Sequence, residues 1–160
     1  MRIYHADPVD FHIIPFPMLE SDYSAVYDVE QKEETLWCAS WHPDYGNDLM
    51  LSWAFREKQH IHAMGLEVPK EQIAPLVSGL GGISLDEAAL AFAPYSRFVY
   101  FPRKPIPFGF SFFLAYLLGL EMTYSGEIGC MSWLSMSTHL EKLCLKATDD
   151  FWNVVEEVAA

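Results

Sequence analysis

The sequence has little positive charge. It contains 10 Lys and Arg residues against 22 Asp and Glu residues, so the formal net charge of the 160-residue chain is −12 at pH 7. A surface with this excess of negative charge repels the phosphate groups of DNA and RNA. The composition therefore argues against a nucleic-acid partner and favours encounter with a basic protein.

Cysteine is also scarce. The sequence has an odd number of cysteines at irregular spacing, namely Cys38, Cys130 and Cys144, and it contains no Cys-x-x-Cys pair. This pattern indicates free thiols in a reducing compartment rather than a disulfide framework. The first residues contain no apolar stretch long enough for a secretory signal, so we expect the protein in the cytoplasm.

The uncharged run at residues 105–120 is too short to cross a membrane. In a helix its sixteen residues span only about 24 Å of a hydrocarbon core that is roughly 30 Å thick. Pro105 and Pro107 begin the run and Gly119 lies at its end, which is typical of a buried helix in a globular domain. The sequence predicts that this segment lies in the core and that the protein has no membrane partner.

In the first half of the sequence, apolar residues recur with a period of two. Apolar residues alternate with polar ones along several stretches, most clearly at Leu49, Leu51, Trp53 and Phe55. Residues 19–30 also fit a helical period, so strand and helix both stay open there. The alternations predict strands, joined as an antiparallel meander, near residues 2–5, 10–14, 23–29, 35–41, 49–55 and 59–64.

Helical spacing dominates the second half. Pro75 predicts that the first of these helices is kinked or begins only near Pro75, and Ser84 with Glu87 forms the capping box that begins the second. Residues 122–133 are compatible with loop or strand. Besides the run at 105–120, the predicted helices cover residues 69–80, 84–92, 138–144 and 148–158, with one strand at 97–101. The fold class predicted is α+β, with an N-terminal antiparallel sheet packed against C-terminal helices in a single domain over residues 1–160.

Negative charge is concentrated near the N-terminus. Residues 1–55 contain ten acidic residues but only Arg2 and Lys32 as bases, so this third of the chain carries −8 of the −12. Such a concentration of charge speeds association with a protein of opposite sign. The residues predicted to bind the partner are Asp28, Glu30, Glu33, Glu34, Asp44, Tyr45 and Asp48.

The sets of residues that could carry catalysis are incomplete. His60 and His62 would share one face of a strand, as metal ligands often do, but the sequence fixes no third ligand. Cys38 and His42 would lie roughly 13 Å apart along a strand, too far for a thiolate–imidazole pair. The glycine-rich stretch at 79–84 lacks the lysine of a phosphate-binding loop. We therefore assign no catalytic residue, no metal and no cofactor.

These features favour a non-enzymatic acidic protein that binds and neutralises a basic protein partner, for example an immunity protein that occupies the active site of a toxin. Two alternatives stay open. One is a small metal-dependent hydrolase that uses His60 and His62. The other is an acidic secretion chaperone, which would bind an unfolded segment rather than a folded domain.

Overall fold

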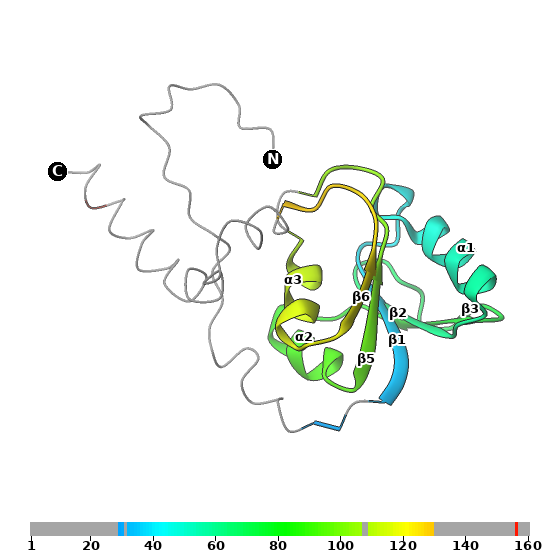
Figure 1. The fold of residues 1–160 in the computed structure, drawn as a ribbon, viewed down its shortest axis with the longest axis horizontal. Coiled ribbons are helices and arrows are strands. Elements are labelled where there is room, and N and C mark those ends of the chain that lie inside the picture. Colours follow the sequence, from blue (N-terminus) through cyan, green and yellow to red (C-terminus); the bar gives the residue numbers. More distant parts are fainter. Residues whose placement is uncertain (1–28, 31, 107–108, 130–155, 157–160) are drawn as a thin grey trace.

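A computed structural model describes residues 29, 30, 32–106, 109–129 and 156 of the chain. Its centre is one six-stranded sheet in the order β3–β4–β2–β1–β5–β6 (Figure 1). All neighbouring strands pair in parallel except β3, which is antiparallel to β4. The strands are β1 (Lys32–Cys38), β2 (Ile61–Met64), β3 (Gln72–Ala74), β4 (Val77–Gly81), β5 (Tyr95–Tyr100) and β6 (Glu121–Tyr124).

Helices cover both faces of this sheet. They are α1 (Asn47–Glu57), α2 (Leu85–Phe92) and α3 (Phe110–Leu117), and a short 3-10 helix, η4 (Pro43–Tyr45), precedes α1. Successive side chains of β1 point to opposite faces: Trp37 packs in the same cluster as Met50 of α1, whereas Leu36 packs with Phe92 and Phe112 of α2 and α3. Figure 1 accordingly shows α1 on one side of the sheet and α2 and α3 on the other.

The direction of the chain across the sheet reverses at β1. From β1 the chain passes outward to β2 and β4, and α2 then returns it to β5 on the other side of β1. In sheets of this kind the loops that follow the two central strands diverge, and they leave a crevice at the carboxyl ends of those strands. Here the loops after β1 and β5 meet at this end of the sheet, where the backbone N–H of Arg103 donates to the carbonyl of Asp44.

The predicted combination of one sheet with helices is confirmed, but the meander needs a correction. β1 and β2 pair in parallel, with Thr35 opposite Ile61, because α1 lies between them as a crossover. Residues 49–55, predicted as the clearest strand, belong to α1. Its buried residues are Met50 and Ala54, four apart, while Phe55 is 75% exposed, so the helical period decides over the period of two.

The predicted helix at 69–80 is also corrected, because these residues contain β3 and β4. Pro75 lies in the turn between the two strands, where its missing N–H removes no ladder hydrogen bond. β3 lies at the edge of the sheet, and the connection from β2 to β4 packs on the face that α1 covers, with Val68 and Ile73 in the same cluster as Met50.

Other elements agree with the sequence. The predicted strands at 59–64 and 97–101 correspond to β2 and β5, the helix at 84–92 corresponds to α2, and β6 covers the start of the ambiguous stretch at 122–133. The uncharged run at 105–120 contains α3, in which the four residues Phe112–Ala115 are at most 1% exposed. This segment is therefore in the core, as predicted.

Several predicted elements cannot be compared with the structure. The strands at 2–5 and 10–14, nearly all of 23–29, and the helices at 138–144 and 148–158 lie outside the described residues, apart from Glu156. Within the described part, none of the helices has the length and apolar character needed to cross a bilayer. The extent of the domain, residues 1–160, stays a prediction.

Candidate functional site

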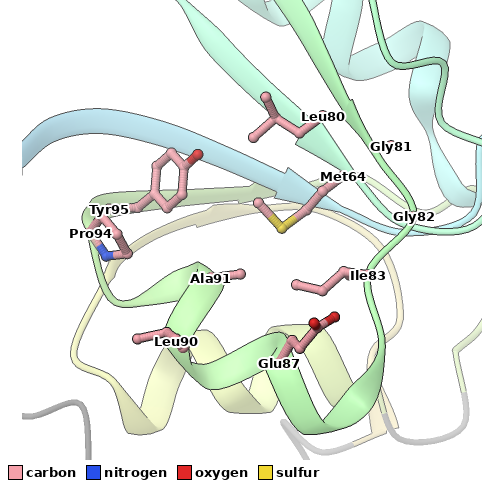
Figure 2. Close-up of a pocket in the computed structure, with 10 residues that line it drawn as sticks. All are labelled: Met64, Leu80, Gly81, Gly82, Ile83, Glu87, Leu90, Ala91, Pro94 and Tyr95. Carbon is pink, nitrogen blue, oxygen red and sulfur yellow. The ribbon is translucent and has the colours of Figure 1, made fainter.

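An apolar pocket of about 440 Å³ lies between α2 and the carboxyl ends of β2 and β4. Figure 2 shows Met64 near its middle, Leu80 and Tyr95 on the sheet side, and Leu90 on the α2 side. The pocket lies on the face of the sheet opposite α1, since Met64 and Tyr95 belong to the cluster of Phe92. Its lining residues are Met64, Leu80, Gly81, Gly82, Ile83, Glu87, Leu90, Ala91, Pro94 and Tyr95.

A polar group closes the end of the pocket near the amino ends of the strands. The hydroxyl of Tyr95 lies 3.1 Å from Nδ1 of His62, and the same nitrogen lies 3.6 Å from a carboxylate oxygen of Glu34. Burial and the negative charge of Glu34 raise the pKa of Tyr95 to about 12. Tyr95 therefore keeps its proton at neutral pH and can donate it to Nδ1 of a neutral His62.

The environment of His62 favours that neutral form. Burial lowers the pKa of His62 below its usual value of 6.5, and the neighbouring His60 lowers it further, while Glu34 acts in the opposite direction. The net shift is downward, so the desolvation of the ring outweighs the attraction of a half-exposed carboxylate. His62 and Tyr95 thus form an uncharged hydrogen-bonded pair beside the negative charge of Glu34.

His60 and His62 are neighbours, as their spacing predicted. Their rings are 5.1 Å apart at 85°, and Nε2 of His60 lies 3.2 Å from Oγ of Ser78 on β4. In the part of the chain that the structure describes, no group of three or more His, Cys, Asp or Glu side chains is placed to hold a metal ion. The hydrolase alternative therefore has two adjacent imidazoles and no third ligand among these residues.

At the other end of the pocket, the polar residue is Glu87 of α2. Its carboxylate accepts a hydrogen bond of 2.7 Å from Oγ of Ser84. This is the predicted capping pair, although here Ser84 donates to the Glu87 side chain and makes no side-chain bond to a backbone amide of the first turn. Glu87 and Glu34 thus place a carboxylate near each end of an apolar pocket.

The predicted partner-binding residues fall into two groups at opposite ends of β1. Glu30, Glu33 and Glu34 lie at its amino end, and Asp44, Tyr45 and Asp48 follow its carboxyl end; Asp28 lies outside the described residues. From Glu34 to the carboxyl end of β1 at Cys38 the strand spans roughly 13 Å, and the second group follows that end. The structure therefore does not gather the predicted residues into one surface.

The second group is neutralised by two bases from the loop after β5. The guanidinium of Arg103 forms an ion pair with Asp48, and this contact holds the pKa of Asp48 below its usual value. Lys104 lies 3.5 Å from Asp44 and 4.3 Å from the centre of the Tyr45 ring. The loops after β1 and β5 are thereby joined, a pairing across 55 residues of sequence that no local pattern could indicate.

The acids at the amino end of β1 form fewer ion pairs. Glu34 approaches His62, but Glu30 and Glu33 are exposed and form no ion pair with any residue that the structure describes. Glu34 is connected to the pocket through His62, whose Nδ1 lies 3.1 Å from the hydroxyl of the lining residue Tyr95. Lys32 also lies at this end, since it pairs with Tyr95 and its backbone N–H donates to the carbonyl of Pro94.

Cys38 forms no thiolate–imidazole pair with a described histidine. The side chain is buried, and this burial raises the pKa of its thiol to about 12. The nearest candidate partner by sequence, His42, instead accepts a hydrogen bond from the backbone N–H of Asp44 through its Nδ1. Cys38 is therefore a packed core thiol whose carbonyl accepts a hydrogen bond from Ser111.

Comparisons with known proteins inform the fold alone. No family model matches the chain, and no curated protein matches it. Among solved structures, it is similar to AviGT4, a glycosyltransferase involved in avilamycin A biosynthesis, with a TM-score of 0.54 and 14% sequence identity. The match covers 87% of this chain and 49% of that chain, so the present chain spans about half the length of the glycosyltransferase.

Proposed function

We propose that this chain is a non-enzymatic cytoplasmic protein that binds and neutralises a basic protein partner, as an immunity protein does with its toxin. The observation that carries the proposal is the group of acids at the amino end of β1, where Glu30 and Glu33 are exposed and form no ion pair with a described residue. Exposed carboxylates attract a basic partner over a distance set by the ionic strength. An apolar pocket then supplies the short-range contact that slows dissociation.

The loops after β1 and β5 contribute less to such binding. Asp44 and Asp48 already pair with Lys104 and Arg103, so a basic partner would have to displace these two bases. These acids still contribute to the net charge, but they are less available for direct contact. Among the described residues we therefore narrow the predicted partner-binding set to Glu30, Glu33 and Glu34.

The test is the association rate with a candidate partner, the product of the gene encoded beside this one. Replacement of Glu30 and Glu33 by Lys should slow association by about tenfold at 50 mM NaCl. The matched control replaces Glu71 and Glu127, two exposed acids near the opposite edges of the sheet, and makes the same change in net charge. Equal slowing by both pairs would show that net charge alone acts, and an unchanged rate in the first pair would remove the proposal.

A second candidate is glycosyl transfer, the activity named for the similar structure. Arg103 and Lys104 favour it, because they follow β5 at the end of a parallel sheet where proteins of this order hold phosphate-bearing ligands. It ranks second because both bases are already paired with acids. Calorimetric titration with a nucleoside diphosphate separates the candidates: heat that disappears in Arg103→Gln supports glycosyl transfer, and no heat in the wild type counts against it.

A further inference from the structure

His60 and His62 lie on one face of the sheet and are within reach of solvent. Ile61, which separates them in the sequence, packs in the cluster that α1 covers, so the two imidazoles belong to the opposite face. His60 is exposed and His62 is partly buried. A small ion in solution therefore has access to both rings.

Ser78 determines which nitrogen of His60 carries the proton. Its hydroxyl donates to Oε1 of Gln72 at 2.9 Å, so it can only accept from Nε2 of His60, which lies 3.2 Å away. The ring proton is thereby held on Nε2, and Nδ1 keeps its lone pair. Among the described residues, none is bonded to this Nδ1.

His62 is oriented through its Nδ1. The hydroxyl oxygen of Tyr95 lies 3.1 Å from this nitrogen, and a carboxylate oxygen of Glu34 lies 3.6 Å from it. Nδ1 can carry the ring proton and donate it to the Tyr95 oxygen, a tautomer that the negative charge of Glu34 favours. Nε2 then keeps its lone pair, and no described residue is bonded to it. Histidines that bind metals are usually oriented in this way, by a polar group at the second ring nitrogen.

The two rings are also at the separation that a shared metal ion requires. Two imidazoles that bind one Zn²⁺ ion at about 2.0–2.1 Å, with a bond angle between about 90° and about 109°, have ring centres roughly 4.5–5.2 Å apart. The ring centres of His60 and His62 are 5.1 Å apart. Glu34 adds a negative charge beside the pair, which attracts a cation.

We propose that His60 and His62 together bind one transition-metal ion that prefers imidazole nitrogen, such as Zn²⁺, through Nδ1 of His60 and Nε2 of His62. Water completes the coordination, because the described residues place no third His, Cys, Asp or Glu at the ion. Mg²⁺ and Ca²⁺ prefer oxygen ligands and should not bind here. This site goes beyond the proposed function, since it involves no protein partner.

The test is calorimetric titration of the full metal-free chain with Zn²⁺ at pH 7.5. His60→Gln and His62→Gln should each raise the dissociation constant at least about tenfold, because each leaves a single imidazole in place of a chelating pair. Ser78→Ala should raise it several-fold, because His60 loses the contact that orients its ring. Mg²⁺ at the same concentration should give no heat.

The matched control is His42→Gln. His42 is an exposed histidine that follows the carboxyl end of β1, and its Nδ1 accepts from the backbone N–H of Asp44. Its replacement removes one imidazole from the chain but should leave the dissociation constant within about twofold of the wild type. Circular dichroism of each variant verifies that the fold is kept.

Nitrogen-15 NMR of the histidine side chains gives a readout that does not depend on affinity. Zn²⁺ should shift the resonances of Nδ1 of His60 and Nε2 of His62 and leave the other nitrogen of each ring protonated. The ion should also raise the melting temperature of the wild type and leave that of His62→Gln unchanged, because a ligand that binds only the folded state stabilises it.

Each outcome decides the proposal. It is supported if affinity falls in both His60→Gln and His62→Gln and is kept in His42→Gln. No binding of Zn²⁺ to the wild type, a loss in only one of the two variants, equal weakening by His42→Gln, or shifts at the opposite ring nitrogens would each overturn it. Unchanged binding in both variants would place the ion elsewhere in the chain and overturn it as well. None of these results depends on the association rate with a protein partner, so this proposal and the proposed function fail separately.

Discussion

At the residue scale, Gly46 fixes the loop between β1 and α1 against the end of β5. Its φ is +79°, a left-handed conformation that costs little for glycine and about 1–2 kcal/mol for other residues. A Cβ atom at this position would lie 1.9 Å from the carbonyl oxygen of Phe101, which is backbone and cannot rotate away. Glycine is therefore required here both by conformation and by contact.

We expect Gly46→Ala to lower the free energy of unfolding by about 3 kcal/mol or more, since strain and steric overlap act together. Gly119→Ala separates the two effects. Gly119 has a similar φ of +75° but no atom within 4 Å of the added carbon, so its substitution should cost only the conformational part, about 1–2 kcal/mol. Urea unfolding of both variants measures the difference, and equal losses would show that the contact with Phe101 is unimportant.

His62 gives the protein a predictable dependence on pH. Its pKa in the folded state is lower than in the unfolded chain, mainly because the ring is partly buried. As the pH falls below the usual value of 6.5, the unfolded state takes up a proton before the folded state does. His62 therefore destabilises the folded state in this range, and the destabilisation increases as the pH falls towards the folded-state pKa.

His62→Gln should remove this contribution. Between pH 7.5 and pH 5.5 the melting temperature should decrease more in the wild type than in the variant, because glutamine takes up no proton in either state. Thermal unfolding at both pH values, in buffers of equal ionic strength, gives the comparison. A variant that loses as much as the wild type would mean that other groups account for the acid sensitivity.

At the scale of elements, the sequence predicted those segments whose signals are local. The Ser84 and Glu87 pair marked the start of α2, and the uncharged run identified α3 as core, because neither inference depends on distant residues. The direction of strand pairing could not be predicted in this way. It depends on whether residues 39–60 turn back or cross over, and the alternation at 49–55 misidentified the helix that makes the crossover.

The candidate site shows the same division. The excess of acids was evident from composition, and the adjacency of His60 and His62 followed from their spacing. Which acids remain available was not predictable, because Arg103 and Lys104 reach Asp48 and Asp44 only after β1 and β5 have paired. The pocket was not predicted for a related reason: its lining residues come from β2, β4, α2 and β5, and part of β4 was predicted as a helix.

α3 supplies a direct test of the core. Phe113 is fully buried, so Phe113→Ala should lower the free energy of unfolding by about 3–5 kcal/mol through lost apolar contact and the cavity left behind. Phe55 on α1 is 75% exposed, and Phe55→Ala should change stability by no more than about 0.5 kcal/mol. Chemical denaturation measures both. Similar losses in the two variants would contradict the assignment of α3 to the interior.

At the scale of the whole molecule, charge acts against the fold. A net charge of −12 on a chain of this size produces repulsion that the compact state concentrates and the unfolded state relieves. The ion pairs of Asp48, Asp44 and Glu121 oppose this repulsion only weakly, because they are exposed and such pairs contribute little. Screening by salt weakens both the repulsion and the ion pairs. Because the repulsion is the larger effect, added salt should stabilise the folded state.

The melting temperature should therefore rise between 10 and 200 mM NaCl, by a few degrees if screening recovers about 1 kcal/mol. Replacement of Glu30 and Glu33 by Lys lowers the magnitude of the net charge without touching a described ion pair, so that variant should start higher and gain less from salt. KCl at the same ionic strength should act like NaCl, because screening depends on charge and not on ion identity. A melting temperature that falls with added NaCl would mean that the ion pairs outweigh the repulsion, and the excess of acids would then be no burden on the fold.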